Sequence, residues 1–429
     1  MNILILGSGG REHTLAWKIS QSPKCKKLFI APGNGGTDTL GQNISIDINN
    51  FEEVKAVVIL NKIDLVVVGP EDPLVNGIVN YFEESYELRK VKIFGPKKSG
   101  AQLEGSKSFS KSFMNRHDIP TAHSKTFNLD EVEEGIKFLK NISPPYVLKA
   151  DGLAAGKGVI IVKNLKEAED ALRNMLINKQ FGLASEKVLI EEFLSGIEVS
   201  SFAITDGENY QMLPEAKDYK RIGENDTGLN TGGMGAVSPV NFYDKEFQKK
   251  VENKIIKRTI EGLKKDNIQY KGFLFVGLMN INGEPYAIEY NVRMGDPETQ
   301  VVIPRIKNDL VEILLSCIDM QLSDITMKIN SKTASTVILS AEGYPEVYKK
   351  GFPISGLEEI NNSMIFHAGT INENNKCLTN GGRVIACTGI GNNLTESLKI
   401  SYKLAEKIDW KGKYYRKDIG KDLSNKIVN

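Results

Sequence analysis

The chain has 429 residues and a formal net charge of +1, from 55 basic and 54 acidic side chains. A hydrophobic share of 41% supports sizeable cores, and this length predicts two to four domains. The nearly neutral charge excludes a protein that attracts nucleic acid or anionic lipid over a broad surface, so we expect neither partner. An anionic substrate must be held by local groups.

The chain carries few redox or targeting signals. Cys25, Cys317, Cys377 and Cys387 show no CxxC or other metal-type spacing, which predicts free, mostly buried thiols in a reducing compartment. Residues 1–6 are too short for a signal peptide, and no stretch approaches the ~20 apolar residues that span a membrane. The sequence therefore predicts a soluble, cytoplasmic protein.

The first hundred residues alternate between short apolar runs and helical patterns. Strands are predicted at 2–6, 28–30, 65–68 and 91–94, with helices from Arg11 onward, at 51–62 and at 74–88. This alternation predicts an α/β domain with a parallel sheet, whose ligands bind at the carboxyl ends of the strands. The Gly/Pro turns that follow the strands are therefore the expected binding sites.

From about residue 100 the pattern changes to α+β. Helices are predicted near 105–117, 166–178, 244–265 and 308–320, and strands near 146–150, 158–163, 187–192, 198–205, 210–213, 273–281 and 285–291. From about 330 the chain becomes mainly short strands, at 334–341, 364–370 and 382–388, with one helix near 393–408. The domain boundaries are predicted near 100–106 and 320–332.

A Gly-rich turn, Gly7–Gly10, separates the first strand from the first helix. It departs from the dinucleotide fingerprint, because Glu12 replaces the last glycine and no acid ends the second strand at Ala31-Pro32. We therefore expect no NAD site. Glycines at a helix N-terminus still expose N–H groups that favour phosphate, which Arg11 and His13 could assist. The alternative is a tight turn without a ligand.

Residues 149–158 resemble a P-loop at first sight. The match fails, because Gly158 stands where Ser or Thr is required and an apolar strand follows in place of a helix. A hairpin whose Gly-rich tip folds over a nucleotide is the better interpretation. Lys149 before the tip and Lys107 upstream are candidates for a phosphate, although a single lysine is more often an ordinary surface residue.

A strand end with two acids follows. Glu191 ends an apolar strand, and Glu198 lies seven residues later. The linker between them presents backbone groups that can bind an adenine edge, and Glu198 can accept bonds from ribose hydroxyls. Two acids at this spacing are also common by chance.

A long polar segment then connects two strands. It contains Asp218, Lys220 and Arg221, and it continues into the Gly-rich stretch 226–236. An irregular loop of this length is usually functional, and the two basic side chains suit an anion. The alternative is a flexible surface loop.

A predicted strand ends in Glu289 and Asn291, with Arg293 two residues on. Alternate side chains of a strand share a face, so these three project together while Tyr290 and Val292 point the other way. A carboxylate and an amide oxygen suit a hard cation such as Mg²⁺, and a guanidinium suits phosphate or carboxylate. This pattern predicts the metal corner of an enzyme that handles a nucleoside triphosphate. The alternative is a strand that ends in polar surface residues.

Taken in order, these segments resemble the ATP-grasp superfamily and, within it, the glycinamide ribonucleotide synthetase family. The resemblance spans the whole chain. It rests on GSGGREH (7–13), APGNGGT (31–37), VGPEDPL (68–74), QLEGSK (102–107), KADGLAAGKGV (149–159), EEFLSGIE (191–198), DTGLNTGGMGA (226–236), EYNVRMGDPETQ (289–300), FHAGT (366–370) and NGGRV (380–384). So many ordered matches leave little room for coincidence.

The resemblance implies three domains. These are an N-terminal Rossmann-like domain at 1–103, a two-part ATP-grasp domain at 104–325 with a mobile lid at about 120–193, and a small β-rich domain at 330–429. It also implies that ATP, glycine and 5-phosphoribosylamine give glycinamide ribonucleotide, ADP and phosphate in de novo purine biosynthesis. A path through glycyl phosphate needs no covalent enzyme nucleophile, which suits a chain without a Ser/His or Cys/His constellation.

The resemblance also implies roles for individual residues at the nucleotide. Lys107, Lys149 and Lys157 would contact the ATP phosphates, and the adenosine would lie against Glu191, Glu192, Phe193, Leu194 and Glu198. Glu289 and Asn291 would bind Mg²⁺ or Mn²⁺. Arg293 and Lys149 are the catalytic candidates, with Arg293 stabilising the transferring phosphoryl group.

For glycine and phosphoribosylamine, the resemblance implies residues from several segments. They are Gly9, Gly10, Glu71, Asp218, Lys220, Asn230, Thr231, Gly232, Gly233, Arg293 and Asp296. The strand before the metal corner, at 275–279, lacks the acidic ligand that many ATP-grasp enzymes have there. We therefore expect the cation to depend on nucleotide phosphates.

Two alternatives remain at this point. The acceptor could differ, as in carboxylating or formylating ATP-grasp enzymes of purine metabolism, or the chain could bind ATP without turnover. If the implied reaction holds, a transient contact with the preceding enzyme of the pathway is also expected, because phosphoribosylamine is short-lived.

Overall fold

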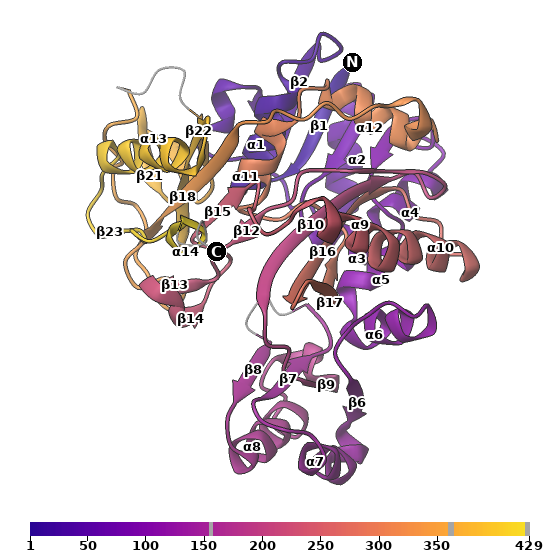
Figure 1. The fold of residues 1–429 in the computed structure, drawn as a ribbon. Coiled ribbons are helices and arrows are strands. Elements are labelled where there is room, and N and C mark those ends of the chain that lie inside the picture. The colour runs from indigo at the N-terminus through magenta and orange to yellow at the C-terminus, as the bar shows by residue number, and fades with distance from the viewer. Residues whose placement is uncertain (154–157, 359–363, 425–429) are drawn as a thin grey trace.

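The computed structural model describes residues 1–153, 158–358 and 364–424, and it has a mixed α/β architecture (Figure 1). No helix within these ranges is long and apolar enough to cross a membrane. All four cysteines are free thiols, as predicted; Cys317 and Cys387 are buried, whereas Cys25 and Cys377 are partly exposed.

The N-terminal sheet is parallel, which confirms the prediction for the first hundred residues. Its strand order is β3-β2-β1-β4-β5. The strands are β1 (Asn2–Gly7), β2 (Lys27–Pro32), β3 (Gln42–Asn43), β4 (Leu65–Val68) and β5 (Lys92–Phe94), and helices α1 (Gly10–Ile19) and α2 (Phe51–Leu60) connect them. The central residues of the inner strands are buried, because Ile, Leu and Val occupy most positions on both faces.

The helix predicted at 74–88 is two helices, α3 (Glu71–Asn76) and α4 (Ile78–Glu84). Gly77 separates them with a φ of 95°, a left-handed conformation that a side chain disfavours. The helix predicted at 105–117 is likewise preceded by another, so that α5 (Lys98–Gly105) and α6 (Lys107–Arg116) meet at Ser106. Both breaks matter for the site, because Glu71 and Lys107 become first residues of helices.

Residues 120–193, called here the 120–193 subdomain, form a separate four-stranded sheet at the bottom of Figure 1. Its order is β6-β9-β7-β8, and two helices pack on it to form its own apolar core. The elements are β6 (Ser124–Asn128), α7 (Val132–Lys140), β7 (Tyr146–Ala150), β8 (Val159–Val162), α8 (Leu165–Leu176) and β9 (Lys187–Glu192). The predicted antiparallel pairing of β7 and β8 is confirmed, and residues 154–157 of the Gly-rich tip lie outside the described residues. β6 and α7 were not predicted.

An antiparallel sheet of order β11-β10-β16-β17 forms the middle of the chain. The strands are β10 (Ile197–Thr205), β11 (Tyr210–Met212), β16 (Gly272–Ile281) and β17 (Glu284–Asn291). The helix predicted at 244–265 packs against β17 and contains a π-helical turn, so it runs as α9 (Lys245–Val251), η5 (Glu252–Ile256) and α10 (Lys257–Lys265). Two short helices follow, α11 (Thr299–Val302) and α12 (Leu310–Ile318).

The C-terminal part is mainly antiparallel sheet, at the left of Figure 1. Its main sheet has the order β12-β15-β18-β22-β19, with β23 paired to β18. The strands are β12 (Lys217–Asp218), β15 (Gly235–Ser238), β18 (Thr333–Ala341), β19 (Met364–His367), β22 (Arg383–Gly391) and β23 (Lys413–Tyr414). Because β12 and β15 come from the middle of the chain, the Gly-rich segment between them lies at the edge of this sheet.

Smaller elements complete this region. The hairpin β13 (Arg221–Gly223) and β14 (Thr227–Asn230) projects from the main sheet, and α13 (Leu394–Lys407) covers one face of it. The strand predicted at 364–370 stops at His367, and β20 (Thr370–Glu373) pairs with β21 (Lys376–Thr379) instead. Helix α14 (Lys421–Ser424) ends the described chain.

Candidate active site

One cleft of about 1280 Å³ gathers nearly all of the predicted site residues. Its walls come from the carboxyl ends of the N-terminal strands, the middle sheet, the 120–193 subdomain and β22. The candidates that line it are Gly9, Glu71, Lys107, Lys149, Glu191, Glu192, Phe193, Leu194, Glu198, Asp218, Lys220, Asn230, Thr231, Gly232, Glu289, Asn291, Arg293 and Asp296. Segments far apart in the sequence therefore share one space.

Two candidates among the described residues, Gly10 and Gly233, do not line the cleft. Gly10 lies behind the turn, where a Cβ would come 2.4 Å from Gln300 Nε2. Gly233 is buried with a φ of 114°, and a Cβ there would come 2.4 Å from Pro297. Lys157 lies outside the described residues. The first two glycines therefore act as close-packing positions beneath the cleft surface.

Lys149 and Glu191 form a buried ion pair on the sheet of the 120–193 subdomain. Val147 of β7 lies directly opposite Glu191 of β9. Lys149, two residues after Val147, is therefore the diagonal neighbour of Glu191 on the same face of the sheet. Lys111 of α6 joins Glu191 at 2.8 Å. Burial by itself raises the pKa of a carboxyl, but these two ammonium groups hold the pKa of Glu191 below its ordinary value.

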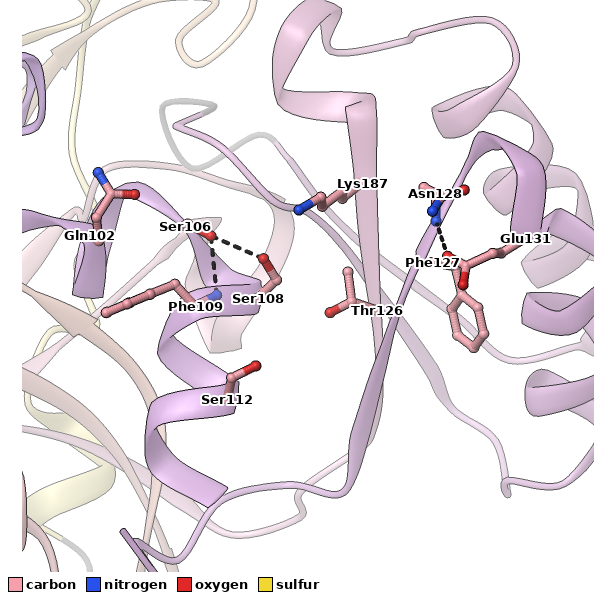
Figure 2. A pocket seen from close by; sticks show the side chains of 10 residues that line it. All are labelled: Gln102, Ser106, Ser108, Phe109, Ser112, Thr126, Phe127, Asn128, Glu131 and Lys187. Carbon is pink, nitrogen blue, oxygen red and sulfur yellow. Dashed lines mark hydrogen bonds between the residues drawn. The ribbon is translucent and has the colours of Figure 1, made fainter. Parts of the chain in front are cut away.

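Helix α6 presents different residues on its two sides. Lys107, Ser110, Lys111 and Met114 line the cleft, and the Lys107 ammonium donates to the Gly152 carbonyl at 3.3 Å. Burial lowers the pKa of Lys107. Ser108, Phe109 and Ser112 instead line a second cavity of about 590 Å³, whose opposite wall includes Thr126 of β6 and Lys187 (Figure 2).

The start of α6 is tied to the loop that follows β7. The Asp151 carboxylate accepts the Ser108 backbone N–H at 2.6 Å and the Ser106 hydroxyl at 3.1 Å. The Ser106 hydroxyl also caps the helix by accepting the Phe109 N–H, as Figure 2 shows. Asp151 therefore fixes the base of the Gly-rich hairpin against the helix that carries Lys107.

The metal corner lies where β17 reaches the cleft. A β-bulge opposite Gly277 and Leu278 leaves Ile288 outside the strand register, just before Glu289. Tyr290 points to the other face of the sheet, where its hydroxyl bonds Thr259 of α10 at 2.6 Å. Glu289, Asn291 and Arg293 all line the cleft, together with parts of Ile288 and Tyr290.

The donors at this corner fit a hard divalent cation only in part. A carboxylate and an amide side chain supply the oxygen donors that Mg²⁺ prefers. Asn291 is buried, and its amide nitrogen has no hydrogen-bond partner among the residues that the structure describes. No cluster of three or more His, Cys, Asp or Glu side chains suited to a metal occurs in the described ranges. The remaining ligands would therefore have to come from phosphate or water.

Arg293 lies between two carboxylates. Its Nε donates to Glu71 at 3.0 Å and its Nη2 to Glu104 at 2.6 Å. Burial raises the pKa of each carboxyl, whereas the neighbouring Arg293 guanidinium lowers it. The positive charges prevail at Glu71, whose pKa falls to about 2, and burial prevails at Glu104, whose pKa rises to about 7. The guanidinium is therefore fixed at the cleft wall before any ligand arrives.

Backbone N–H groups at the Gly7–Gly10 turn and the start of α1 already donate to carboxylates. The Gly9 N–H donates to Glu12 at 2.7 Å, and the Arg11 N–H donates to Asp296 at 3.1 Å. These are two of the N–H donors that a phosphate at this helix N-terminus would need. The hydrogen bonds of the turn thus weigh against a phosphate bound directly there.

His13 lies neither in the cleft nor on the surface. It lies on α1 and is buried against β19, where its Nδ1 accepts the backbone N–H of His367 at 2.8 Å. Burial and the neighbouring His367 lower the pKa of His13 to about 3. The residue therefore joins the N-terminal and C-terminal parts and does not assist at the turn.

The Gly-rich loop after β14 is held by the C-terminal sheet. Arg383 at the start of β22 donates from Nη1 to the carbonyls of Gly232 and Asp296, each at 2.6 Å. The Gly232 N–H donates to the hydroxyl of Tyr344 at 3.0 Å. Because Arg383 also lines the cleft, residues beyond 330 shape the end of the site that contains Asn230 and Thr231.

Acidic and basic groups alternate at that end. Lys220 donates to Glu198 at 2.7 Å. Asp218 is close to this pair, and burial raises its pKa. Glu298 accepts the Ser200 hydroxyl at 3.2 Å, and burial together with Asp218 raises the pKa of Glu298 to about 7. This end can therefore hold a cation between carboxylates.

Sequence reasoning missed several residues that line the cleft: Glu12, Glu104, Lys111, Glu298 and Arg383. Lys111 lies four residues after Lys107, so helical spacing could have placed both on one face. Glu12 follows Gly9 by three residues, a capping-box spacing. Glu104, Glu298 and Arg383 lie within segments that carry the family resemblance, but no spacing rule singles them out within those segments.

Comparison with known proteins agrees with this geometry. Models of the N domain, the ATP-grasp (A) domain and the C domain of phosphoribosylglycinamide synthetase match residues 1–104, 105–299 and 334–422. A curated phosphoribosylamine–glycine ligase of Haemophilus influenzae is 46% identical over 425 residues, which are 98% of each chain. One from Caldanaerobacter subterraneus is 44% identical over 419 residues, covering 98% of this chain and 99% of the relative.

Solved structures extend the comparison. The phosphoribosylamine–glycine ligase of Thermotoga maritima superposes with a TM-score of 0.84 at 36% identity, over 97% of this chain and 100% of that one. The biotin carboxylase domain of Hydrogenobacter thermophilus 2-oxoglutarate carboxylase, in complex with MgADP and bicarbonate, gives 0.72 at 16% identity, over 99% and 94% of the two chains. The second likeness shows a shared fold alone.

Proposed function

Because this chain belongs to the phosphoribosylglycinamide synthetase family, an ATP-grasp family of ATP-dependent ligases, we propose that its cleft joins glycine to 5-phosphoribosylamine. The products are glycinamide ribonucleotide, ADP and phosphate, in de novo purine biosynthesis. The observation that carries the proposal is the single cleft that contains both the nucleotide candidates and the loop 230–232.

The nucleotide would lie between the 120–193 subdomain and the middle sheet. The linker from Phe193 to Gly196 lines the cleft at the junction of β9 and β10, where an adenine edge can meet backbone groups. Glu198 would hold the ribose in place of its present partner Lys220. Lys107 and Lys149 would hold the phosphates, and ATP must then draw Lys149 away from Glu191 or share it.

Glu289 and Asn291 would hold a divalent cation, Mg²⁺ or Mn²⁺, together with the nucleotide phosphates. When bound, such a cation neutralises phosphoryl charge and orients the transferred group. Arg293 lies beside this corner and would bind the oxygens of the phosphoryl group and of the acyl phosphate. Its two carboxylate partners fix its orientation in advance.

The acceptor end would take glycine and phosphoribosylamine. The carboxylate of Asp296 already accepts from the Arg11 backbone N–H and from Gln300, and it lies near the Arg383 guanidinium. We therefore place the glycine ammonium nearer Asp218. Asn230, Thr231 and Gly232 would contact phosphoribosylamine together with Lys220, Glu71 and Gly9. The hydrogen bond from Arg383 to Gly232 keeps the loop 230–232 facing the cleft.

The reaction follows from these positions in two steps. A carboxylate oxygen of glycine attacks the γ-phosphorus, the bond to the β-phosphate oxygen breaks, and ADP leaves. The phosphoribosylamine nitrogen then attacks the acyl carbon, phosphate leaves with the C–O bonding pair, and the nitrogen loses a proton. No protein nucleophile is required, and the side chains act by positioning and by balancing charge.

The direct test measures ADP and phosphate release by the purified protein. Release that requires glycine and freshly generated phosphoribosylamine together supports the proposal. Release driven by bicarbonate or formate would favour a different acceptor. ATP binding without turnover would favour a protein that only binds the nucleotide.

A further inference from the structure

Glu104 is a buried carboxylate at the end of α5, and its side chain is 6% exposed. Its Oε1 accepts from Arg293 Nη2 at 2.6 Å, and its Oε2 accepts from the backbone N–H of Val292 at 2.8 Å. One carboxylate thus holds both the guanidinium of Arg293 and the backbone on its N-terminal side.

The donors of Arg293 show what this contact leaves for a ligand. A guanidinium has five N–H groups. In the described part of the chain, Nε donates to Glu71, Nη1 to the Met294 carbonyl at 3.3 Å, and Nη2 to Glu104. Each Nη carries a second hydrogen, so two N–H groups remain for oxygens in the cleft. Their direction depends on the three bonds that are already made.

The two carboxylates on Arg293 are not equivalent. The Glu71 side chain is 28% exposed, lies at the cleft wall and also approaches Arg11 at 4.0 Å. A substrate can therefore compete for Glu71. Glu104 also lines the cleft, but its side chain is only 6% exposed, and its two oxygens already accept from residues 292 and 293. Glu104 is thus the partner that Arg293 keeps when ligands enter.

Glu104 also connects Arg293 to the phosphate lysine Lys107. Helix α5 ends at Gly105 and α6 begins at Lys107, so only Ser106 separates the two helices. Any shift of the end of α5 would move Glu104 and Lys107 together relative to β17. A displacement of about 1 Å in a reacting group can cost roughly 100-fold in rate.

We propose that Glu104 is a positioning residue for phosphoryl transfer, which fixes the guanidinium of Arg293 relative to Lys107 and the metal corner. This inference rests on the proposed function, because it assigns to Arg293 a role in the ligase reaction. It predicts that Glu104 affects the rate through Arg293 and not through ATP binding.

The test is a double-mutant cycle of Glu104→Gln and Arg293→Lys. Gln is isosteric and keeps an acceptor for the Val292 N–H, but it loses the charge that holds the guanidinium. Glu104→Gln should lower kcat by roughly 30-fold or more and leave KM for ATP within about threefold. The double variant should have a kcat less than about threefold below that of Arg293→Lys alone. Multiplicative effects of the two substitutions would overturn the proposal.

Two measurements separate this inference from its premises. Activity of the wild-type protein with glycine and phosphoribosylamine tests the proposed function by itself. A crystal structure of Glu104→Gln tests the inference without any assay: the guanidinium should leave its place beside residue 104. An unmoved guanidinium would refute the role. Glu84→Gln on the exposed side of α4 is the control and should change neither readout.

Discussion

The Lys149 ammonium is paired with the Glu191 carboxylate inside the large cleft, and both side chains are 6% exposed. Lys111 shares the same carboxylate at 2.8 Å. Glu191 therefore compensates two buried positive charges at once. A nucleotide phosphate brings further negative charge to these lysines, so the pair and the ligand compete for them.

Glu191→Leu should destabilise the protein by about 3 kcal/mol or more, because it leaves two buried ammonium groups without their counter-charge. Lys111→Met should cost less, since Lys149 still compensates Glu191. Urea denaturation measures both. Glu186→Gln, at an exposed position before β9, is the control. Equal losses for Glu191→Leu and the control would show that the pair does not stabilise the fold.

Arg293→Ala should lower kcat by roughly 100-fold or more while the Kd for ATP changes less than about threefold, because its interactions strengthen in the transition state. Steady-state kinetics and calorimetry with a non-hydrolysable analogue separate the two effects. Arg116→Ala on the exposed side of α6 should alter neither quantity. Unchanged turnover would remove Arg293 from the mechanism.

Mg²⁺ should bind the nucleotide-free protein with a Kd above roughly 1 mM, because the corner offers two protein oxygen ligands and Mg²⁺ relies on phosphates for the rest. Calorimetry should show much tighter binding with an ATP analogue present. Glu289→Gln should raise the Mg²⁺ concentration needed for half-maximal activity. Tight binding to the nucleotide-free protein would contradict this account of the corner.

Arg383→Met should raise KM for phosphoribosylamine roughly tenfold and leave KM for ATP nearly unchanged, since it removes charge-assisted bonds to the carbonyls of Gly232 and Asp296. Substrate-dependence curves measure both constants. Lys376→Met, exposed on β21 in the same part of the chain, is the control. An equal rise in both KM values would indicate general unfolding of the site.

The buried pair His13 and His367 should make stability depend on pH. Burial lowers their pKa values from 6.5 to about 3 and about 4. Below pH 6.5 the unfolded chain binds protons that the folded protein excludes, so stability falls as pH falls, by about 1.4 kcal/mol per pH unit for each histidine.

His13→Asn keeps an acceptor for the His367 N–H but cannot bind a proton. Its stability should therefore fall less steeply than that of the wild-type protein between pH 6.5 and 5, by about 1 kcal/mol per unit. Denaturation curves at several pH values measure the slopes. Parallel curves for His13→Asn and the wild type would contradict the buried neutral pair.

The elements were predictable where local pattern decides them. The apolar runs of the N-terminal sheet, the β7–β8 hairpin and the alternation of Glu289, Asn291 and Arg293 all follow from residue spacing. The break at Gly77 and the extra helix α5 were not predicted: Gly77 changes the backbone direction without changing the apolar period, and α5 lies where a domain boundary was expected.

The contacts between distant segments were the other part that spacing could not supply. Glu104 meets Arg293 across 189 positions, and Arg383 meets Gly232 across 151. Glu191 was assigned to adenine, yet in the ligand-free protein it pairs with Lys149 and Lys111. Such partners depend on tertiary packing, which brings together charges that no local window contains.

The pairing of β15 with β18 limits how early this part of the protein can fold during synthesis. Strand β15 ends at Ser238, whereas β18 begins at Thr333. During synthesis the Gly-rich loop and β15 leave the ribosome well before the strand that anchors them. Strand β15 therefore gains its pairing with β18, and the loop its bond to Arg383, only after those later segments have emerged, and a nascent chain that stops earlier lacks part of the cleft wall.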